Sequence, residues 1–266
     1  MRKVIYTVLT GNYDKLEQPL VTDPSYDYVC LSDMDGQDGV WQIRRIPQEE
    51  SNPVLRSRYA KMHPHLLLPE YDLSVYMDAN LCVAGAAFYD IIDKWAENPD
   101  KAVPFGKADS PQIPFAVVQH PERDCVWDEL RKCFLKDRIS TASAIKWYRY
   151  LKGTGMPRHT GLAEANVLVR LHNNQSVIGL DERWWELLLK SACLRDQLSF
   201  TPAIHEENVS LSLLLPPGQN ARNTDCIRYV NHPRTGKENV PGNINWANAK
   251  YKIRLLWRKL VLLFLK

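Results

Sequence analysis

The chain has 266 residues, of which 45% are hydrophobic and 24% charged. This length and composition fit one large soluble domain, or one domain with a small appendage, with a substantial buried core. The net charge of +3 is unevenly spread, because residues 251–266 carry five Lys and Arg side chains and no acid, which leaves −2 for the remainder. A slightly acidic domain with a basic tail argues against general nucleic-acid binding, which needs a broad basic face.

The cysteines and the N-terminus both point to a cytoplasmic protein. Six cysteines are scattered along the chain without a CxxC pair. This spacing favours free thiols in a reducing compartment over a disulfide framework or a zinc cluster. The opening sequence MRKVIYTVLT is too short and too quickly polar for a signal peptide, and it predicts a first strand instead.

The hydrophobic pattern predicts strands that alternate with helices. Strands are expected at 3–10, 26–33, 41–46, 73–77 and 165–172. A helix is expected over 52–67, with Asn52 as N-cap and Pro53 at the first position. Further helices are expected over 86–98, twice within 121–152, and from residue 181 onward. The last of these is followed by a tight polar turn at Arg195–Gln197. Such alternation implies a parallel or mixed α/β sheet with right-handed crossovers. Residues 215–245 are rich in Pro, Gly and Asn and predict an irregular segment lying over a site.

Polar clusters follow three of the predicted strands, at Thr10–Tyr13, Ser32–Asp33 and Asp78–Asn80. Ligands of open α/β sheets bind at the carboxyl ends of the strands. One such cluster is more often a strand cap or a turn. Three of them favour a binding site, because parallel neighbouring strands would bring all three clusters to one edge of the sheet.

Six segments carry a resemblance to a known family: YTVLTGNYDKL, NPVLRSRYAKMHPHLLLPEY, SVYMDANL, HPERDC, GLAEANVLVRLHN and RDQLSF. Together they resemble a glycosyltransferase-like family, formerly catalogued as a domain of unknown function, with bacterial members and plant members associated with cell-wall polysaccharide. The resemblance spans residues 3–205, in the family's order. A more distant resemblance is to retaining GT-A galactosyltransferases that build bacterial lipopolysaccharide. It implies a GT-A-like (Rossmann-like) domain over 1–250, with a mixed, mostly parallel sheet flanked by helices.

The resemblance also implies roles for individual residues. Donor binding is assigned to Thr7, Thr10, Asn12, Tyr13, Asp33, Arg56, Lys61, Asp78 and Lys237. Metal binding is assigned to Asp78, Asn80 and His232, and catalysis to Asp196 and Gln197; Glu164 is a further catalytic candidate because it is a carboxylate directly before the strand at 165–172. His120 and Arg123 are candidates for binding an acceptor or a phosphate. A strand cap explains Asp33 nearly as well, and a solvated helix face explains Arg56, Arg58 and Lys61.

The chemistry of a nucleotide-sugar donor gives the segment Asp78-Ala79-Asn80 a physical meaning. The diphosphate must leave with its charge neutralised, and Mg²⁺ or Mn²⁺ held by protein oxygens can do this. Asp78 offers a carboxylate and Asn80 a carbonyl oxygen on the same side of an extended chain. Because Asn80 is uncharged, the metal is expected to bind less tightly, and cations of the 52–67 helix are the alternative means of neutralisation. Mn²⁺ also accepts an imidazole, which suits His232.

Two interpretations remain open for Asp196. It follows Arg195, so a local ion pair is the simple one. The alternative is an inward-facing polar turn whose carboxylate orients the sugar or stabilises positive charge at the anomeric carbon. Gln197 would then hydrogen-bond a sugar hydroxyl, and Glu164 is a second carboxylate for the same chemistry.

Residues 251–266 predict an amphipathic helix with its basic side chains on one side and Ile, Leu, Trp, Val and Phe on the other. The stretch is too short and too charged to span a bilayer. Binding to the anionic cytoplasmic face of a membrane suits it. The alternative is a C-terminal helix docked on its own domain or on a second subunit.

The sequence therefore predicts a cytoplasmic glycosyltransferase, peripheral on the inner membrane face, acting in surface polysaccharide biosynthesis. It would transfer a sugar from a nucleotide-sugar, such as a UDP-sugar, to a glycan or lipid-linked acceptor, with Mn²⁺ or Mg²⁺ as cofactor. The alternatives are a metal-dependent hydrolase using the same site and a non-catalytic protein that binds sugar nucleotides or glycans.

Overall fold

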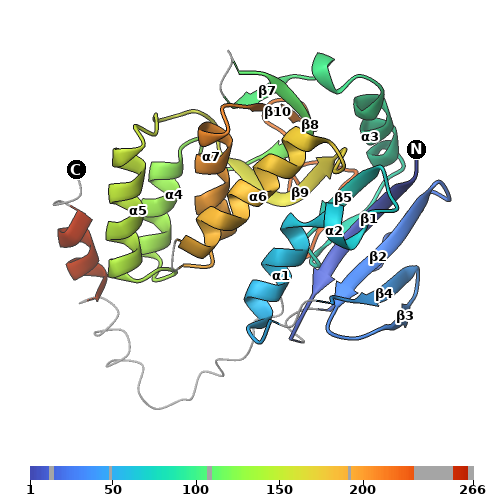
Figure 1. Ribbon diagram of the computed structural model, residues 1–266, viewed down its shortest axis with the longest axis horizontal. Coiled ribbons are helices and arrows are strands. Elements are labelled where there is room, and N and C mark those ends of the chain that lie inside the picture. The colour runs from blue at the N-terminus through green and yellow to red at the C-terminus, as the bar shows by residue number, and fades with distance from the viewer. Residues whose placement is uncertain (12–14, 48–49, 107–109, 191–192, 231–253, 263–266) are drawn as a thin grey trace.

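The computed structural model describes residues 1–11, 15–47, 50–106, 110–190, 193–230 and 254–262 (Figure 1). Its strands are β1 (Lys3–Leu9), β2 (Tyr26–Ser32), β3 (Gly36–Asp38), β4 (Trp41–Arg45), β5 (Leu73–Met77), β6 (Leu81–Val83), β7 (Pro104–Gly106), β8 (Gln112–Gln119), β9 (Ala163–Arg170), β10 (Ser210–Leu213) and β11 (Ile227–Tyr229). Nine of them form one sheet in the order β3-β4-β2-β1-β5-β9-β8-β10-β7, and β6 pairs with β11 separately.

The large sheet is mixed, and most of its strands point the same way. β4, β2, β1 and β5 are successive parallel neighbours. β9 is antiparallel to both β5 and β8, and β10 is parallel to β8. Six of the nine strands therefore share one direction, with β3, β7 and β9 opposed. The predicted mixed, mostly parallel α/β sheet is confirmed.

Helices cover both faces of this sheet. They are α1 (Pro53–Met62), α2 (Pro64–Leu67), α3 (Ala87–Glu97), α4 (Val126–Leu135), α5 (Thr141–Gly153), α6 (Gln175–Lys190) and α7 (Asp196–Glu206), with a short 3₁₀ helix at Pro99–Lys101. Side chains alternate between the two faces of a strand, so Val4 and Tyr6 of β1 pack towards α1, α6 and α7, whereas Ile5 packs towards α3. The two halves of the core lie on opposite sides of the sheet.

Local sequence explains where α1 begins and ends. The Asn52 side chain caps the helix by accepting a hydrogen bond from the backbone N–H of Val54 at 2.9 Å, and Pro53 occupies the first turn. The helix ends at Met62 because Pro64 disfavours a helical conformation at His63. The single helix predicted over 52–67 is therefore two, α1 and α2.

Residues 254–262 form a helix that packs on the α4–α5 pair (Figure 1). Val261 and Leu262 contact the cluster of buried side chains that α4 and α5 share. The helix thus docks on its own domain, and binding of its outer side to a membrane stays a prediction. Among the described residues, no helix is both long enough and apolar enough to cross a bilayer.

The polar turn predicted at Arg195–Gln197 is wrong, because Asp196 is the first residue of helix α7. Eight of the eleven residues of α7 are buried, so its sequence has no polar face and no clear helical period. Strand β8 was not predicted either, although it lies inside the sheet, between β9 and β10. All six cysteines are buried and free.

Candidate functional site

The carboxyl ends of β1, β2 and β5 lie side by side at one edge of the sheet. These strands are parallel neighbours, so Thr10, Asp33 and Asp78, which directly follow them, share that edge, as predicted. The antiparallel strand β9 begins at the same edge, where the backbone N–H of Asp78 donates to the Asn166 carbonyl at 2.9 Å. This pairing brings Glu164 near the other three residues.

Lys61 lies at the centre of a cluster of charged side chains at this edge. Its side chain is 1% exposed, and its Nζ lies 2.6 Å from Oδ2 of Asp196 and 3.7 Å from Oδ1 of Asp78. The ammonium also lies 4.8 Å from the centre of the Tyr76 ring. Arg58, one turn earlier on α1, places Nη1 3.4 Å from Oδ2 of Asp196. We call Arg58, Lys61, Asp78 and Asp196 the Lys61 cluster.

Further buried polar groups hold the backbone of Lys61 in place. Its backbone carbonyl accepts hydrogen bonds of 2.9 Å from the Tyr6 hydroxyl and from the Arg170 guanidinium. Arg170 is paired with Asp181 at 3.0 Å, and neither side chain is exposed. Burial raises the pKa of Asp181 to about 7, against the opposing effect of Arg170. Sequence analysis missed this pair, because Arg170 ends an apolar strand and Asp181 is followed by Glu182 and Arg183, so neither stands out as part of a site.

Asp196 stays ionised although it is buried. Burial alone would raise its pKa, but the positive charges of Arg58 and Lys61 outweigh burial and hold the pKa well below its usual range. Its position in the first turn of α7 adds the favourable field of the helix N-terminus. Trp184 Nε1 donates to the Asp196 carbonyl at 2.9 Å, which fixes the start of α7 against α6.

Asp78 is the carboxylate of the Lys61 cluster that reaches solvent, with its side chain 36% exposed. The Tyr76 hydroxyl donates to its Oδ1 at 2.7 Å, and the contact with Lys61 also involves Oδ1. Burial, followed by the Asp78 charge, raises the pKa of Tyr76 well above its usual value. Tyr76 therefore remains a neutral donor that orients Asp78.

Asn80 connects the sheet edge to Val230, which directly follows β11. Its side-chain amide donates to the Val230 carbonyl at 3.0 Å, and the Val230 N–H returns a bond of 2.9 Å to the Asn80 carbonyl. Because the amide nitrogen is used, the side-chain oxygen is the atom Asn80 could offer to a metal. The predicted ligand His232, together with Asn12, Tyr13 and Lys237, lies outside the described residues.

Asp33 and Arg56 form a separate and more exposed pair at the ends of β1 and β2. Arg56 forms an ion pair with Asp33 Oδ1, while the Gly11 N–H donates to Asp33 Oδ2 at 2.6 Å. Thr10 donates its hydroxyl to the Pro53 carbonyl at 2.8 Å and so ties β1 to the start of α1. Thr7 lies inside β1 and is 2% exposed, so contact with a donor would require the surrounding chain to open.

Glu164 is paired with Arg222, a residue that sequence analysis did not single out. Arg222 Nη1 lies 2.5 Å from Glu164 Oε1, and its guanidinium stacks 4.7 Å from the centre of the Tyr229 ring. Burial raises the pKa of Glu164, with Arg222 opposing the rise. Arg222 belongs to the part of the irregular segment that the structure describes, so that part does reach the sheet edge.

Gln197, His120 and Arg123 are held by internal contacts. Gln197 donates its amide to the Ala163 carbonyl at 3.2 Å. Arg123 lies 2.8 Å from His120 Nε2 and 2.7 Å from the buried carboxylate of Glu129. Burial and, next, the charge of Arg123 lower the pKa of His120 to about 4. His120 is therefore neutral at physiological pH, and its role towards an acceptor stays a prediction.

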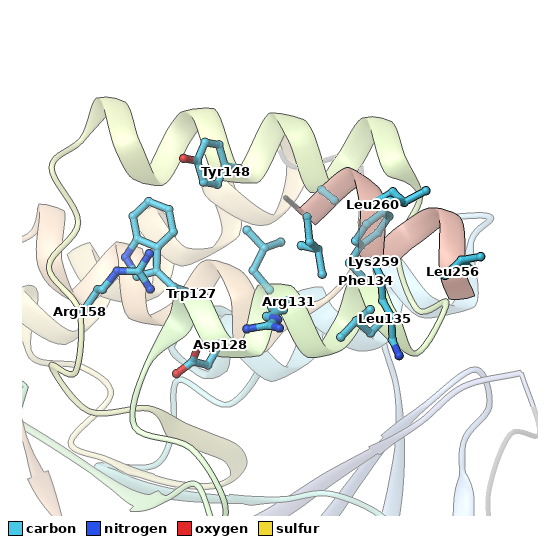
Figure 2. A pocket seen from close by; sticks show the side chains of 13 residues that line it. Trp127, Asp128, Arg131, Phe134, Leu135, Tyr148, Arg158, Leu256, Lys259 and Leu260 are labelled. Carbon is cyan, nitrogen blue, oxygen red and sulfur yellow. The ribbon is translucent and has the colours of Figure 1, made fainter. Parts of the chain in front are cut away.

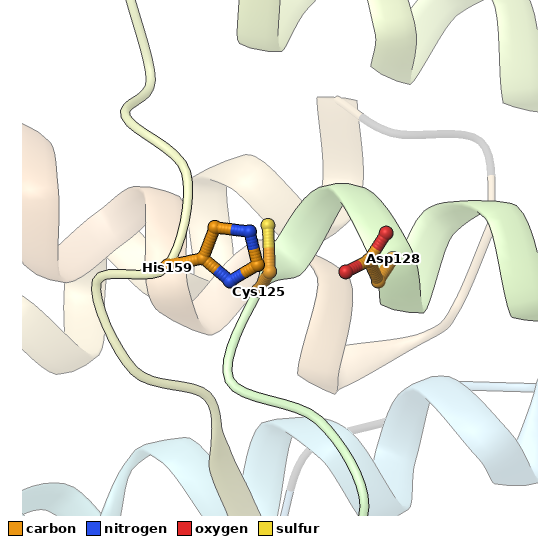
Figure 3. Close-up of side chains that lie close together, drawn as sticks. All are labelled: Cys125, Asp128 and His159. Carbon is orange, nitrogen blue, oxygen red and sulfur yellow. The ribbon is translucent and has the colours of Figure 1, made fainter.

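Another group of possible metal ligands lies at the start of α4 (Figure 3). Ligand atoms of Cys125, Asp128 and His159 lie within 4.8 Å of one another. His159 contacts Asp124 through Nδ1 at 2.9 Å. Sulfur and imidazole donors suit zinc, whereas the oxygen atoms of Asp78 and Asn80 suit Mg²⁺ or Mn²⁺. This group is distinct from the metal site predicted from the sequence.

No family model matches the chain, and no curated protein matches it. Among solved structures, the chain is similar to one described as the apo structure of the bifunctional glycosyltransferase WbbM. The two share 12% sequence identity with a TM-score of 0.40, and the match covers 80% of this chain and 38% of that one. The chain thus spans well under two thirds of the length of that protein.

Proposed function

We propose that the chain is a glycosyltransferase that moves a sugar from a nucleotide-sugar donor to a glycan or lipid-linked acceptor in surface polysaccharide biosynthesis. The observation that carries the proposal is the Lys61 cluster. Two cations and two carboxylates meet at the carboxyl edge of an α/β sheet, which is where such folds bind ligands. Asp78 and Asp196 come from the two segments that the sequence resemblance assigns to diphosphate and sugar.

Charge balance favours an additional cation when the donor is bound. The positive charges of Arg58 and Lys61 are already matched by Asp78 and Asp196, so an incoming diphosphate adds uncompensated negative charge. Asp78 is suited to bind a metal because it is the partly exposed carboxylate of the cluster. Its contacts with Lys61 and Tyr76 both involve Oδ1, so Oδ2 is the oxygen it could offer to the metal. We infer that Asp78, with the Asn80 oxygen and His232, would hold Mg²⁺ or Mn²⁺. The metal would supply neutralisation of the leaving diphosphate.

The remaining donor contacts belong to the neighbouring strand ends. Asp33 and Arg56 are proposed to contact the nucleoside or its phosphates, together with Thr10, Asn12 and Tyr13, and with Lys237 from the later segment. Thr7 is buried, so its proposed role is to support the strand end from within the sheet. These residues would set the position of the nucleotide relative to Asp196.

Asp196 is the proposed catalytic carboxylate. An ionised group held rigidly in a poorly solvated site stabilises developing positive charge more strongly than it would in water. Asp196 meets this requirement because Lys61 and Arg58 keep its pKa low and Trp184 fixes its backbone. Gln197 and Glu164 are proposed to orient the sugar, and His120 and Arg123 to meet the acceptor.

The proposal includes a cytoplasmic protein that associates with an anionic membrane through residues 251–266, beside a transferase domain over 1–250. Docking of the helix over 254–262 changes which side chains can take part. Arg258 is 6% exposed and is used within the protein, whereas Lys259 is exposed. The membrane contact is therefore proposed to depend on the outward side of this helix.

A panel of UDP-, GDP- and CMP-sugars tests the proposal through thermal stabilisation, with and without Mn²⁺. Stabilisation by one nucleotide class, enhanced by Mn²⁺ and lost in Asp78→Ala, is the expected result. No response to any donor would remove the transferase proposal. Release of free sugar without an acceptor would favour the hydrolase, and donor binding without any turnover would favour the non-catalytic binding protein.

A further inference from the structure

A groove of about 470 Å³ lies between α4 and the helix at 254–262, away from the sheet edge (Figure 2). It is lined by Trp127, Asp128, Leu130, Arg131, Phe134, Leu135, Ala144, Tyr148, Arg158, Leu256, Lys259, Leu260 and Leu262. We call it the C-terminal groove. Its volume falls in the range of sites that bind small molecules.

Arg258 fixes the wall of this groove. Its guanidinium is buried, where it donates to the carbonyl of Phe134 in the last turn of α4 and to that of Ile139 beyond the helix, and it pairs with Asp137. Terminal carbonyls of a helix have no partner within the helix, so a cation that caps them is favourable. The helix at 254–262 is therefore held in one orientation, with Val261 and Leu262 turned inward.

This orientation leaves an apolar strip on the outside. Leu256, Trp257 and Leu260 are 62%, 47% and 50% exposed. Positions 256 and 260 are one helical turn apart, so they lie on one side of the helix, nearly opposite Arg258. Three large apolar side chains gathered on two turns of an exposed helix indicate a surface that is covered in use.

The rim of the groove is positively charged. Its lining includes the three cations Arg131, Arg158 and Lys259 and the single acid Asp128, and all three cations are exposed. Arg158 lies 5.0 Å from the centre of the Trp127 ring. An apolar floor beneath a cationic rim is complementary to a molecule with a hydrocarbon chain and an anionic head.

We propose that the C-terminal groove binds the acyl chain of an anionic phospholipid at a membrane surface, with the cations along its rim, Arg131, Arg158 and Lys259, attracting the anionic head groups. A second copy of the chain fits less well, because a symmetric contact would bring the same three cations together. A small polar metabolite would leave the apolar floor unmatched. The groove deepens the membrane association proposed above, but it does not depend on the transferase chemistry.

Vesicle co-sedimentation tests the charge and the apolar surface separately. Wild-type protein is expected to bind vesicles of phosphatidylcholine mixed with phosphatidylglycerol, and not vesicles of phosphatidylcholine alone. Lys259→Glu should weaken binding by roughly tenfold, and Leu260→Asp by about tenfold or more. The matched controls are Lys94→Glu on α3 and Leu66→Asp on α2, both exposed, and they should bind as wild type.

Quenching of tryptophan fluorescence by phosphatidylglycerol with brominated acyl chains tests whether a chain enters the groove. Trp127 lines the groove, whereas Trp257 is on the exposed helix surface. We expect quenching to persist in Trp257→Phe and to fall in Trp127→Phe. Quenching that is lost in Trp257→Phe and unchanged in Trp127→Phe would overturn the proposal, because the helix would then lie on the bilayer with no chain in the groove.

Two further outcomes would also overturn it. One is equal binding to vesicles with and without phosphatidylglycerol. The other is a wild-type protein that does not bind vesicles and is a dimer in light scattering, with the Leu260→Asp variant a monomer. Donor-induced thermal stabilisation of the same variants should match wild type. A failed lipid test with intact donor binding would therefore remove the groove proposal and leave the proposed transferase function standing.

Discussion

Two ion pairs at the same sheet edge, Asp33–Arg56 and Asp196–Lys61, use similar groups in different surroundings. The side chains of Asp33 and Arg56 are 30% and 23% exposed, whereas those of Asp196 and Lys61 are 11% and 1% exposed. Coulomb interactions strengthen as water is excluded, and so does the cost of leaving a charge unpaired. The Asp33–Arg56 pair can hold a surface loop in place, while the Asp196–Lys61 pair keeps a carboxylate charge in a fixed position with little water around it.

The difference teaches where chemistry at this edge is most favourable. Asp33 is tied to the Gly11 backbone and to Arg56, and it joins the loops after β1 and β2. Asp196 is held by two cations and by α7, with its charge maintained by a lowered pKa. A site that positions a nucleotide can tolerate a solvated pair. A site that stabilises a transition state benefits from the buried one.

The largest expected effect comes from removing Lys61. Lys61→Met removes the closest cation of the buried Asp196 and leaves Arg58 as its ion-pair partner, and breaking a buried pair in this way costs about 3–5 kcal/mol of unfolding free energy. Urea denaturation measures it. The double variant Lys61→Met with Asp196→Asn should recover part of the loss, since no buried carboxylate charge remains. A loss below about 1 kcal/mol in Lys61→Met would contradict the buried-pair description.

As the pH falls, the contribution of His172 to stability should be lost without discharging the Lys61 cluster. Burial, then Arg170, lowers the pKa of His172 from 6.5 to about 4, so the unfolded chain binds the extra proton first. Its contribution to stability is complete above about pH 6.5 and is lost as the pH falls towards 4, by on the order of 3 kcal/mol. Asp196 retains its charge over this window, because its stabilising effect is lost only as the pH falls through its lowered pKa.

Urea denaturation between pH 7 and pH 4.5 measures this loss. His172→Gln should reduce the acid-induced loss by the contribution of His172 but not remove it, because the pKa of His120 is also lowered, to about 4. An equal slope in His172→Gln and wild type would show that another group controls acid sensitivity.

Much of the fold was predictable because local patterns carry it. The buried strands β1 and β5, the amphipathic helix α3 and the Asn52 cap each follow from a few neighbouring residues. That the strand-end polar residues share one edge of the sheet was also predictable, since their positions depend only on strand direction.

The interior of the site was less predictable. Lys61 and Asp196 are 135 residues apart in the chain, and only the packing of α1 against α6 and α7 brings them together. Helix α7 is buried on most of its surface, so its sequence lacks the periodicity that reveals a helix. Arg222 lies in a segment rich in turn residues, where no spacing indicates its partner Glu164.

A smaller effect is expected at Tyr76, which links the buried cluster to the exposed carboxylate. Tyr76→Phe removes the hydroxyl that donates to Asp78 at 2.7 Å and should cost about 1–2 kcal/mol of unfolding free energy. Donor affinity should fall as well, because Asp78 loses its orientation. Calorimetric titration with the donor measures the second effect, and Tyr148→Phe, on α5 beside the C-terminal groove, is the control.

The smallest effect is expected at the exposed pair. Arg56→Ala should cost no more than about 1 kcal/mol, as partly solvated ion pairs usually do. Added salt should narrow the difference between Arg56→Ala and wild type, and it should hardly change the effect of Lys61→Met. Similar salt sensitivity in both variants would mean that the two pairs are equally solvated.

The most direct test of the central claim is the rate of sugar transfer by Asp196→Asn and Asp33→Asn, measured with the donor that stabilises the wild type. Asp196→Asn should lower kcat by about 100-fold to 1000-fold, with donor affinity largely kept. Asp33→Asn should mainly raise KM. A variant Asp196→Asn that turns over at the wild-type rate, or a larger loss of kcat in Asp33→Asn, would contradict the assignment of the Lys61 cluster as the catalytic site.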